Sequence, residues 1–438
     1  MATATRIKLS TTDSGVFSVG VRADSAQAAS EVLQEDMEKH HIFFNAMHFH
    51  NHIVHHILTI YALGATPDII KSAYERNQSY QRPVYPVDEH VVQEMSDKSK
   101  FKQYIYKEEH YTNFLVYFQR EIDAKGVGAV LNEHLFAEDE HADGMLVRLF
   151  AGFLHPIIHL GFGIEFNQPA IVAQALAQAA VHDNWIEKFL IPAEKAAGGI
   201  GKRGTKTILQ LLDEMRADKK LVESVQWSDG NKISEGVLLR APDEMIKYAS
   251  QYTVSADQVE EKMAEMINAV VYYTIAAQRP PKEIKFDFFY MHSVNSSIFF
   301  PALLSLPSLS TRAKLRLMEW KGRVDLAMYV SRGSPNLLLE EITNYQPSRD
   351  WKAIFDSSIR HSRDDGHVSK MVRAVANGER VCKPFEAGGK ERGFIIQGDM
   401  WLKIGNMIID SVSGPGDLWI RSTGFDEAWS KFEDRPRL

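Results

Sequence analysis

The sequence contains a single cysteine, Cys382, among 438 residues. This scarcity excludes an internal disulfide framework and a cysteine-rich metal site, so a bound metal would need nitrogen and oxygen ligands. The chain also lacks a run of about 18 apolar residues, which predicts that no segment spans a membrane. The N-terminus lacks the apolar stretch of a secretory signal, and we therefore expect a cytoplasmic protein.

An excess of positive charge is absent as well. The formal net charge is −7 and the isoelectric point is near 6.2, which gives no electrostatic basis for binding nucleic acid. Hydrophobic residues make up 45% and charged residues 24% of the chain, the ordinary balance of a globular protein. A chain of this length can bury a large core without disulfide bonds.

Strand-like alternation is scarce, and helical periodicity dominates after residue 25. Capping signals support several helices, for example Thr66 before Pro67. We therefore predict an all-α, multi-helix single domain over residues 26–438, with a central cavity, after an extended segment at residues 1–25. The expected helices lie at residues 26–39, 51–63, 67–77, 108–124, 168–189, 205–218, 243–252, 256–278, 287–304, 310–330, 366–376 and 399–412.

Histidine, by contrast, is concentrated: seven of the 17 histidines fall within residues 40–56. On a helix, His48, His52 and His56 would stack along one face. The apolar residues 57–63 follow directly, so this helix is expected to enter a core. Buried imidazoles need partners, and a transition metal or a proton-handling site would provide them. A solvated polar helix face is the alternative interpretation.

A second histidine pair, His155 and His159, flanks Pro156. Proline suits the first turn of a helix, which would place His155 at the start of that helix and His159 one turn further. Glu165 lies beyond a Gly-x-Gly bend and is a candidate acceptor for an imidazole N–H in the second coordination sphere.

Two later segments complete the set of candidates. His292 lies in the aromatic stretch of residues 286–292, where we expect it to be buried, and a lone core histidine is the alternative. His367 and Lys370 are three residues apart on a helix that is expected to begin near residue 364. Histidines on four apolar helices can converge on an interior metal. The metal-ligand candidates are His52, His56, His159, His292, His367 and Lys370.

Lys370 needs a separate explanation, because an ammonium group would repel a metal cation. Burial and a neighbouring cation both lower the pKa of a lysine amine. A neutral amine can react with carbon dioxide to give a carbamate, which is an anionic oxygen ligand. We therefore predict that Lys370 is carboxylated and binds, or lies against, the metal. The alternative is a surface lysine paired with an acidic residue.

Several familiar motifs compete with this interpretation. Residues 199–204 match the glycine fingerprint of dinucleotide-binding folds, but no parallel α/β pattern surrounds them. His182 and Asp183 resemble the adjacent His-Asp pair of all-α metal phosphohydrolases. Two Glu-x-x-His motifs, Glu38 to His41 and Glu138 to His141, match those of di-iron bundles, although the polar run 138–143 is more typical of a loop. A non-catalytic helical scaffold is a further alternative.

Residues 49–56 (FHNHIVHH) and 61–65 (YALGA) resemble the opening signature of the questin oxidase-like family. The segment 155–161, the aromatic stretch around His292 and the segment 365–373 are similar to its later blocks, so the resemblance covers about residues 14–412. Members are mostly fungal proteins of aromatic polyketide pathways. The resemblance implies oxidative opening of the quinone ring of an anthraquinone such as questin, with a Baeyer–Villiger-type or dioxygenase-type outcome.

This implied activity agrees with the residues. The sequence contains no convincing flavin-binding or dinucleotide-binding fingerprint, so an oxygenase would need another means of activating O2. We expect histidine-bound Fe(II), a non-haem iron, to provide it. Proton transfer is assigned to His155, or to whichever of His52 and His56 is not a ligand. The expected partners are O2 and a small aromatic polyketide. The family name oxidase does not decide whether the reaction also takes reducing equivalents from NADPH. The candidate substrate-stacking residues are Phe289, Tyr290 and Phe299.

Overall fold

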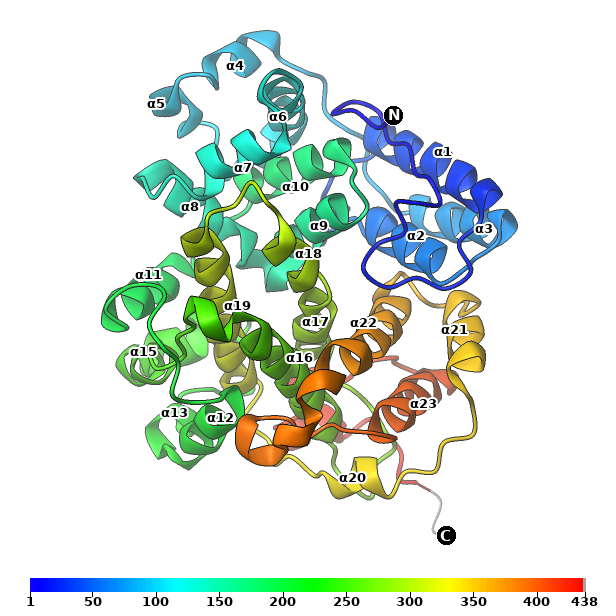
Figure 1. Cartoon of the computed structure of the whole chain (residues 1–438), viewed down its shortest axis with the longest axis vertical. Helices are drawn as coiled ribbons and strands as arrows, with labels where there is room; N and C mark the ends of the chain where they lie inside the picture. The colour runs from blue at the N-terminus through cyan, green and yellow to red at the C-terminus, as the bar shows by residue number, and fades with distance from the viewer. Residues whose placement is uncertain (436–438) are drawn as a thin grey trace. The chain divides into compact units, whose positions relative to one another are not determined.

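The computed structural model describes residues 1–435 of the chain (Figure 1). These residues form α-helices joined by turns and short 3₁₀ or π segments, and their β pairing is limited to isolated bridges such as that between Phe43 and His50. The predicted all-α fold is confirmed. The periodicity of the sequence reveals this class because amphipathic helices repeat their apolar residues at helical spacing.

The described residues group into two compact units. The first comprises Met1–Trp185, Phe299–Ser310 and Ile359–Lys370. Residues 1–22 contain no helix, and α9 packs against α10 and α18. The helices of this unit are α1 (Ala23–Lys39), α2 (Ile53–Ala62), α3 (Pro67–Gln78), α4 (Glu89–Glu94), α5 (Lys98–Phe101), α6 (Tyr111–Lys125), α7 (Val127–Leu135), α8 (Glu140–Leu149), α9 (Ala151–Glu165), α10 (Pro169–Val181) and α18 (Phe300–Ser305).

The second unit comprises Ile186–Ile298, Thr311–Ser358 and Met371–Leu438, of which residues up to 435 are described. The long helix α19 (Thr311–Ser331) lies within it and packs against α11, α12, α15, α16 and α17. Its helices are α11 (Glu187–Ala196), α12 (Ile208–Ala217), α13 (Lys219–Glu223), α14 (Leu238–Arg240), α15 (Pro242–Ala249), α16 (Val259–Ala276), α17 (Phe288–Ser297), α19, α20 (Glu340–Thr343), α21 (Trp351–Ile359), α23 (Met400–Ser413) and α24 (Asp426–Trp429). Helix α22 (His367–Cys382) begins in the first unit and ends in the second.

Helix α2 shows how the histidine-rich segment is built. All of its residues are buried, including His55 and His56. The side chain of Asn51 accepts a hydrogen bond from the backbone N–H of Ile53 at 2.9 Å, which starts the helix there. His48 consequently lies in the preceding loop, with a positive φ of 58°. The predicted stack of His48, His52 and His56 on one helix face is therefore wrong.

Other helix boundaries also differ from the prediction. Only the first two residues of the polar run 138–143 lie in a loop, because α8 begins at Glu140 and Asp139 caps it by accepting a hydrogen bond from Ala142 N–H at 2.8 Å. Polar residues of this kind favour both loops and helix N-termini, and the sequence alone does not separate the two. The expected helices at 168–189 and 287–304 are each divided into two.

The expected bend at Gly161-x-Gly163 is also absent, because both glycines lie inside α9. A Cβ on Gly161 would lie 2.2 Å from Cγ of Phe299, so glycine allows the side chain that precedes α18 to pack directly on α9. Within residues 1–435, no single helix is both long and apolar enough to cross a membrane. In this described part of the chain, α8 and α9 are the one pair of helices that together reach that length and composition, and they are bent by 94°.

Candidate metal centre

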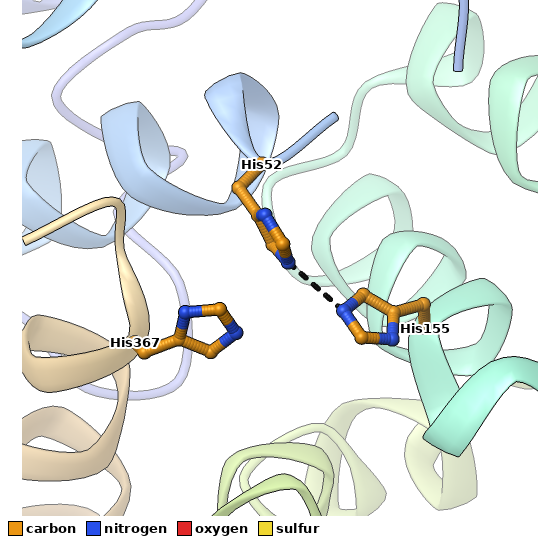
Figure 2. Close-up of side chains that lie close together, drawn as sticks. All are labelled: His52, His155 and His367. Carbon is orange, nitrogen blue, oxygen red and sulfur yellow. Dashed lines mark hydrogen bonds between the residues drawn. The ribbon is translucent and has the colours of Figure 1, made fainter. Parts of the chain in front are cut away.

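Three buried histidines of the first unit converge at one point (Figure 2). His52 directly precedes α2, His155 lies near the start of α9, and His367 is the first residue of α22. Each offers one ligand nitrogen, and these nitrogens lie within 4.8 Å of one another. The residues are 6%, 5% and 2% exposed respectively, so water has little access to their rings. Three neutral imidazoles at this spacing could hold one transition-metal ion.

Hydrogen bonds to the other ring nitrogens fix two of these imidazoles. His155 Nδ1–H donates to the carbonyl oxygen of Gly152 at 2.6 Å. His367 Nδ1–H donates to Oδ1 of Asp365 at 2.6 Å, and Oδ2 of the same carboxylate lies 3.9 Å from His52 Nδ1. In the neutral forms of His155 and His367, the lone pair is therefore on Nε2. Acceptors behind the rings are the usual way in which proteins orient metal-binding histidines.

The facing nitrogens of His52 and His155 are close together. Their Nε2 atoms are 2.9 Å apart, a distance at which one nitrogen can donate to the other. The same distance fits two ligands of one ion, because imidazole nitrogens bind at about 2.0–2.1 Å and adjacent ligands at a right angle are then about 3 Å apart. The donor set therefore fits a first-row transition metal without rearrangement of these two rings.

The environment keeps the His52 imidazole uncharged. Burial, reinforced by the charge of neighbouring His367 and Lys370, lowers the pKa of His52 well below its ordinary value. Burial alone would raise the pKa of Asp365, which is half-exposed, but the charge of His367 and their hydrogen bond outweigh it and lower that pKa. A neutral imidazole and an ionised carboxylate are the protonation states that metal binding requires.

His155 follows an unusual left-handed turn. Residues Gly152, Phe153 and Leu154 have positive φ angles of 52°, 53° and 69°. Two further histidines close over this turn: a Cβ on Gly152 would lie 2.2 Å from His182 Nε2 and 2.9 Å from His50 Cε1. Backbone strain of this kind persists only where the surroundings impose it, and it is frequent at functional sites.

Gly152→Ala is accordingly expected to destabilise the protein by about 1–3 kcal/mol, through its positive φ and the displaced imidazoles. Chemical denaturation at neutral pH measures this change. Gly414→Ala is the matched control, because Gly414 has a negative φ of −80° and open space around its Cα. Equal stability of the two variants would contradict the assignment of strain to this turn.

The pair formed by His50 and His182 extends the cluster. Asp183 N–H donates to His182 Nδ1 at 3.2 Å, which puts the proton of the neutral ring on Nε2. That nitrogen donates to His50 Nε2 at 3.0 Å, and the His50 ring stacks on His155 at 3.9 Å between centroids. Both ring nitrogens of His182 thus bond within the protein.

His55, His159 and Lys370 form an adjacent polar group. Lys370 is 3% exposed, and its Nζ lies 3.4 Å from His55 Nδ1. The alternative of a surface lysine paired with an acid is therefore wrong. Burial lowers the pKa of Lys370 to about 8, although Asp365 and Asp364 oppose the shift. The His55 and His159 rings are 5.2 Å apart, and His55 Nε2 has no hydrogen-bond partner among the described residues.

His56 is oriented away from the three converging histidines. Asn77 Nδ2 donates to His56 Nδ1 at 3.0 Å, and the amide orientation is fixed because Tyr80 donates its hydroxyl proton to Asn77 Oδ1 at 2.8 Å. The proton of neutral His56 is therefore on Nε2, which lies 3.8 Å from Oδ2 of Asp364. Asp364 in turn accepts backbone N–H groups at the start of α22, from Val368 among others.

The remaining predicted site residues make other contacts. In the second unit, His292 Nδ1–H donates to Phe288 O at 2.6 Å, Phe289 lies against Arg332, and Tyr290 donates to Tyr329 O at 2.8 Å. In the first unit, Phe299 packs on Phe162, and Glu165 accepts a hydrogen bond from Val16 N–H at 2.8 Å. The roles assigned to these five residues stay predictions.

Sequence reasoning overlooked Asp365 and Asn77 as site residues. A carboxylate two residues before His367 at a helix start was the available signal for Asp365, because that spacing lets the side chain reach the ring. Nothing in the sequence pointed to Asn77, since its contact with His56 depends on how α3 packs against α2.

The buried imidazoles also make stability depend on pH. Burial lowers the pKa of His159 from its ordinary value of 6.5 to about 3. Between pH 6.5 and 3 the unfolded chain therefore binds a proton that the folded chain does not. The free energy of unfolding is expected to fall by about 1.4 kcal/mol per pH unit for each such histidine as the pH drops below 6.5.

Urea denaturation of the metal-free protein between pH 7.5 and 5.0 measures this slope. His159→Gln should make the slope shallower by about one histidine's contribution, since glutamine does not titrate. A slope that is the same in both proteins would show that His159 is already charged in the folded state.

Comparison with known proteins gives independent evidence on the family to which this chain belongs. A family model described as Questin oxidase-like matches residues 49–375. A Baeyer-Villiger oxidase from Pestalotiopsis fici is 41% identical over 93% of this chain and 93% of its own. A questin oxidase from Aspergillus terreus is 40% identical, and a Baeyer-Villiger monooxygenase from Cryptosporiopsis sp. is 38% identical, each over 98% of both chains. The similarity therefore spans the whole cluster.

Proposed function

The chain belongs to the questin oxidase-like family and is an oxidoreductase, and from this premise we propose that it is a non-haem iron oxygenase. Its proposed reaction is oxidative opening of the quinone ring of an anthraquinone-type polyketide with O2, in secondary metabolism. The names of the relatives, questin oxidase and Baeyer-Villiger oxidase, support a ring-opening oxidation. The convergence of three buried histidines is the observation that carries the metal part of the proposal.

In this proposal His52, His155 and His367 hold the iron. Bound Fe(II) would supply the redox chemistry that O2 activation needs, which no side chain provides by itself. Asp365 and the Gly152 carbonyl orient the rings, so that their Nε2 atoms face one point before the metal arrives. Burial of the three residues keeps competing water away.

We assign proton transfer to His56, which is not one of the three converging histidines. His56 carries its proton on Nε2, faces the Asp364 carboxylate, and is held by Asn77 at its other nitrogen. His155, the other candidate, lies among the ligands. Because the Asn77 amide occupies Nδ1, proton exchange at His56 would take place at Nε2, beside the Asp364 carboxylate.

Lys370 supplies the negative charge in this proposal. The neutral amine nitrogen attacks the carbon of CO2, a C–N bond forms, and one proton leaves to water, which yields a carbamate. Its buried position beside His55 supports this reaction, because the ammonium form is disfavoured there. The carbamate would bind, or lie against, the iron as an anionic oxygen ligand.

The proposed activity is tested by incubating the iron-loaded enzyme with a hydroxyanthraquinone under air and under argon. We expect a ring-opened product only in air, with ¹⁸O from ¹⁸O2 incorporated into it and with no turnover after removal of iron by a chelator. Parallel reactions with and without NADPH define the need for a reductant. Turnover under argon, or hydrolysis of a phosphoester in its place, would favour a His182-Asp183 hydrolase over an oxygenase. Purified protein that neither contains nor gains metal would favour a scaffold.

Asp365 offers a quantitative test of the centre. Asp365→Ala removes the acceptor of His367 Nδ1–H and the charge nearest to His52, and metal affinity is expected to fall by about 10–100-fold. Competition with a chromogenic chelator measures the affinity. Asp356→Asn, which removes an exposed carboxylate that pairs with Lys352, is the matched control and should leave affinity unchanged. Unchanged affinity in Asp365→Ala would place the metal elsewhere.

A further inference from the structure

A second cluster of metal-ligating side chains lies where α6, α7 and α8 meet, separate from the residues of the proposed iron centre. Glu121 belongs to the last turns of α6, Glu133 and His134 to α7, and His141 to the first turn of α8 (Figure 1). A ligand atom from each of Glu121, Glu133 and His134 lies within 4.8 Å of the other two. Sequence analysis reached this region only through the Glu-x-x-His motif that ends at His141.

The imidazole in this cluster has an unusual environment. His134 is 1% exposed, and its Nδ1 lies 2.9 Å from His141 Nε2. Its Nε2 has no hydrogen-bond partner among residues 1–435, and one of its ring nitrogens lies within 4.8 Å of a carboxylate oxygen of Glu121 and of Glu133. The rings of Phe101 and Phe118 pack against His134 and restrict its rotation. A buried nitrogen that is left without a partner costs free energy, and a ligand would relieve that cost.

The carboxylates already attract a cation. Lys125 Nζ lies 2.5 Å from Oε2 of Glu121 and 2.8 Å from Oε2 of Glu133, and the lysine side chain is 40% exposed. Among the residues that the structure describes, this ammonium pairs with the two carboxylates, and His134 Nε2 has no hydrogen-bond partner. A divalent ion could pair with all three groups, while the flexible lysine moves into solvent.

We propose that Glu121, Glu133 and His134 form a second metal site, which binds a divalent transition-metal ion of the Zn²⁺ class in place of the Lys125 ammonium. One imidazole nitrogen and two carboxylate oxygens are ligands that zinc accepts. His141 is the positioning residue, since its Nε2 lies 2.9 Å from His134 Nδ1 and a hydrogen bond there leaves His134 Nε2 for the ion. The bound ion links α6 to α7, on the side where α7 meets α8.

The protonation states of the ligands favour binding at neutral pH. Burial lowers the pKa of His134 to about 3, so its ring is neutral. The hydrogen bond from Lys125 lowers the pKa of Glu133, so its carboxylate is ionised. Neither ligand has to release a proton before zinc binds.

Equilibrium dialysis against micromolar ZnCl2 tests the proposal, with zinc counted in the full-length wild type and in Glu133→Gln. We expect the wild type to bind one more zinc ion than Glu133→Gln, because any zinc in the other histidine centre is the same in both. Glu89→Gln is the matched control, since it removes a carboxylate from an exposed ion pair with Arg120 and should not change the count. Equal counts in the wild type and Glu133→Gln would overturn the site.

Lys125→Met keeps the test valid even if a ligand variant folds poorly. Without the competing ammonium, zinc affinity at this site is expected to rise about three- to tenfold, from the loss of two partly exposed ion pairs. Amide hydrogen exchange then localises the effect: zinc should slow exchange within residues 111–149 in the wild type and Lys125→Met, but not in Glu133→Gln. Equal protection of this segment in all three, or an unchanged affinity in Lys125→Met, would refute the proposal.

Discussion

Replacing His52 by alanine is expected to abolish iron binding and to lower kcat/KM by at least about 10³-fold, the effect of losing several kcal/mol of metal-dependent stabilisation. His52 faces His155 with a separation of 2.9 Å between their Nε2 atoms, so its loss removes one of the three converging nitrogens. The remaining pair could not hold an ion tightly, because each further ligand adds affinity and restricts exchange with water.

His56→Ala is the matched comparison, because His56 is four residues further on and is also buried. We expect this variant to lose about 1–3 kcal/mol of stability, since one N–H of the buried Asn77 amide loses its acceptor, yet to retain its iron. Elemental analysis after chelator-free purification distinguishes the two variants, and denaturation measures the stability loss. Iron retained by His52→Ala but lost from His56→Ala would reverse our assignment of the ligand.

Lys370→Ala and Lys370→Arg are both expected to lose bound iron and turnover, because neither side chain can form a carbamate. Arginine preserves length and positive charge, and a guanidinium does not give up its proton near neutral pH. Loss of function in Lys370→Arg would therefore show that charge and length do not substitute for the amine. The predicted effect is again a loss of at least about 10³-fold in kcat/KM, as for a missing metal ligand.

Enzyme prepared in ¹³C-labelled bicarbonate provides a readout that does not depend on activity. A carbamate carbon resonance should appear in the ¹³C spectrum of the metal-free wild type and be missing from Lys370→Arg. Metal-free protein is required because iron broadens nearby signals. If Lys370→Ala retains full iron and normal turnover, the carbamate hypothesis is wrong, whereas the histidine centre would still stand.

The sequence determined the properties that depend on local interactions. The all-α class followed from helical periodicity, and Thr66-Pro67 correctly marked the start of α3, because these signals act within one or two turns. The clustering of histidines indicated a buried polar centre, since α2 is otherwise apolar and enters the core. The family signature extended this to an oxidoreductase.

Which histidines meet could be decided only by the tertiary structure. Spacing on an ideal helix grouped His52 with His56, but an Asn51 side-chain hydrogen bond starts α2 at Ile53 and leaves His52 before it. His155 joins the group because a left-handed turn at residues 152–154 redirects the chain, and Asp365 joins because it accepts a hydrogen bond from His367 Nδ1 at the start of α22. Turns with positive φ and contacts between distant helices depend on packing across the whole unit, and a one-dimensional pattern carries no record of that packing.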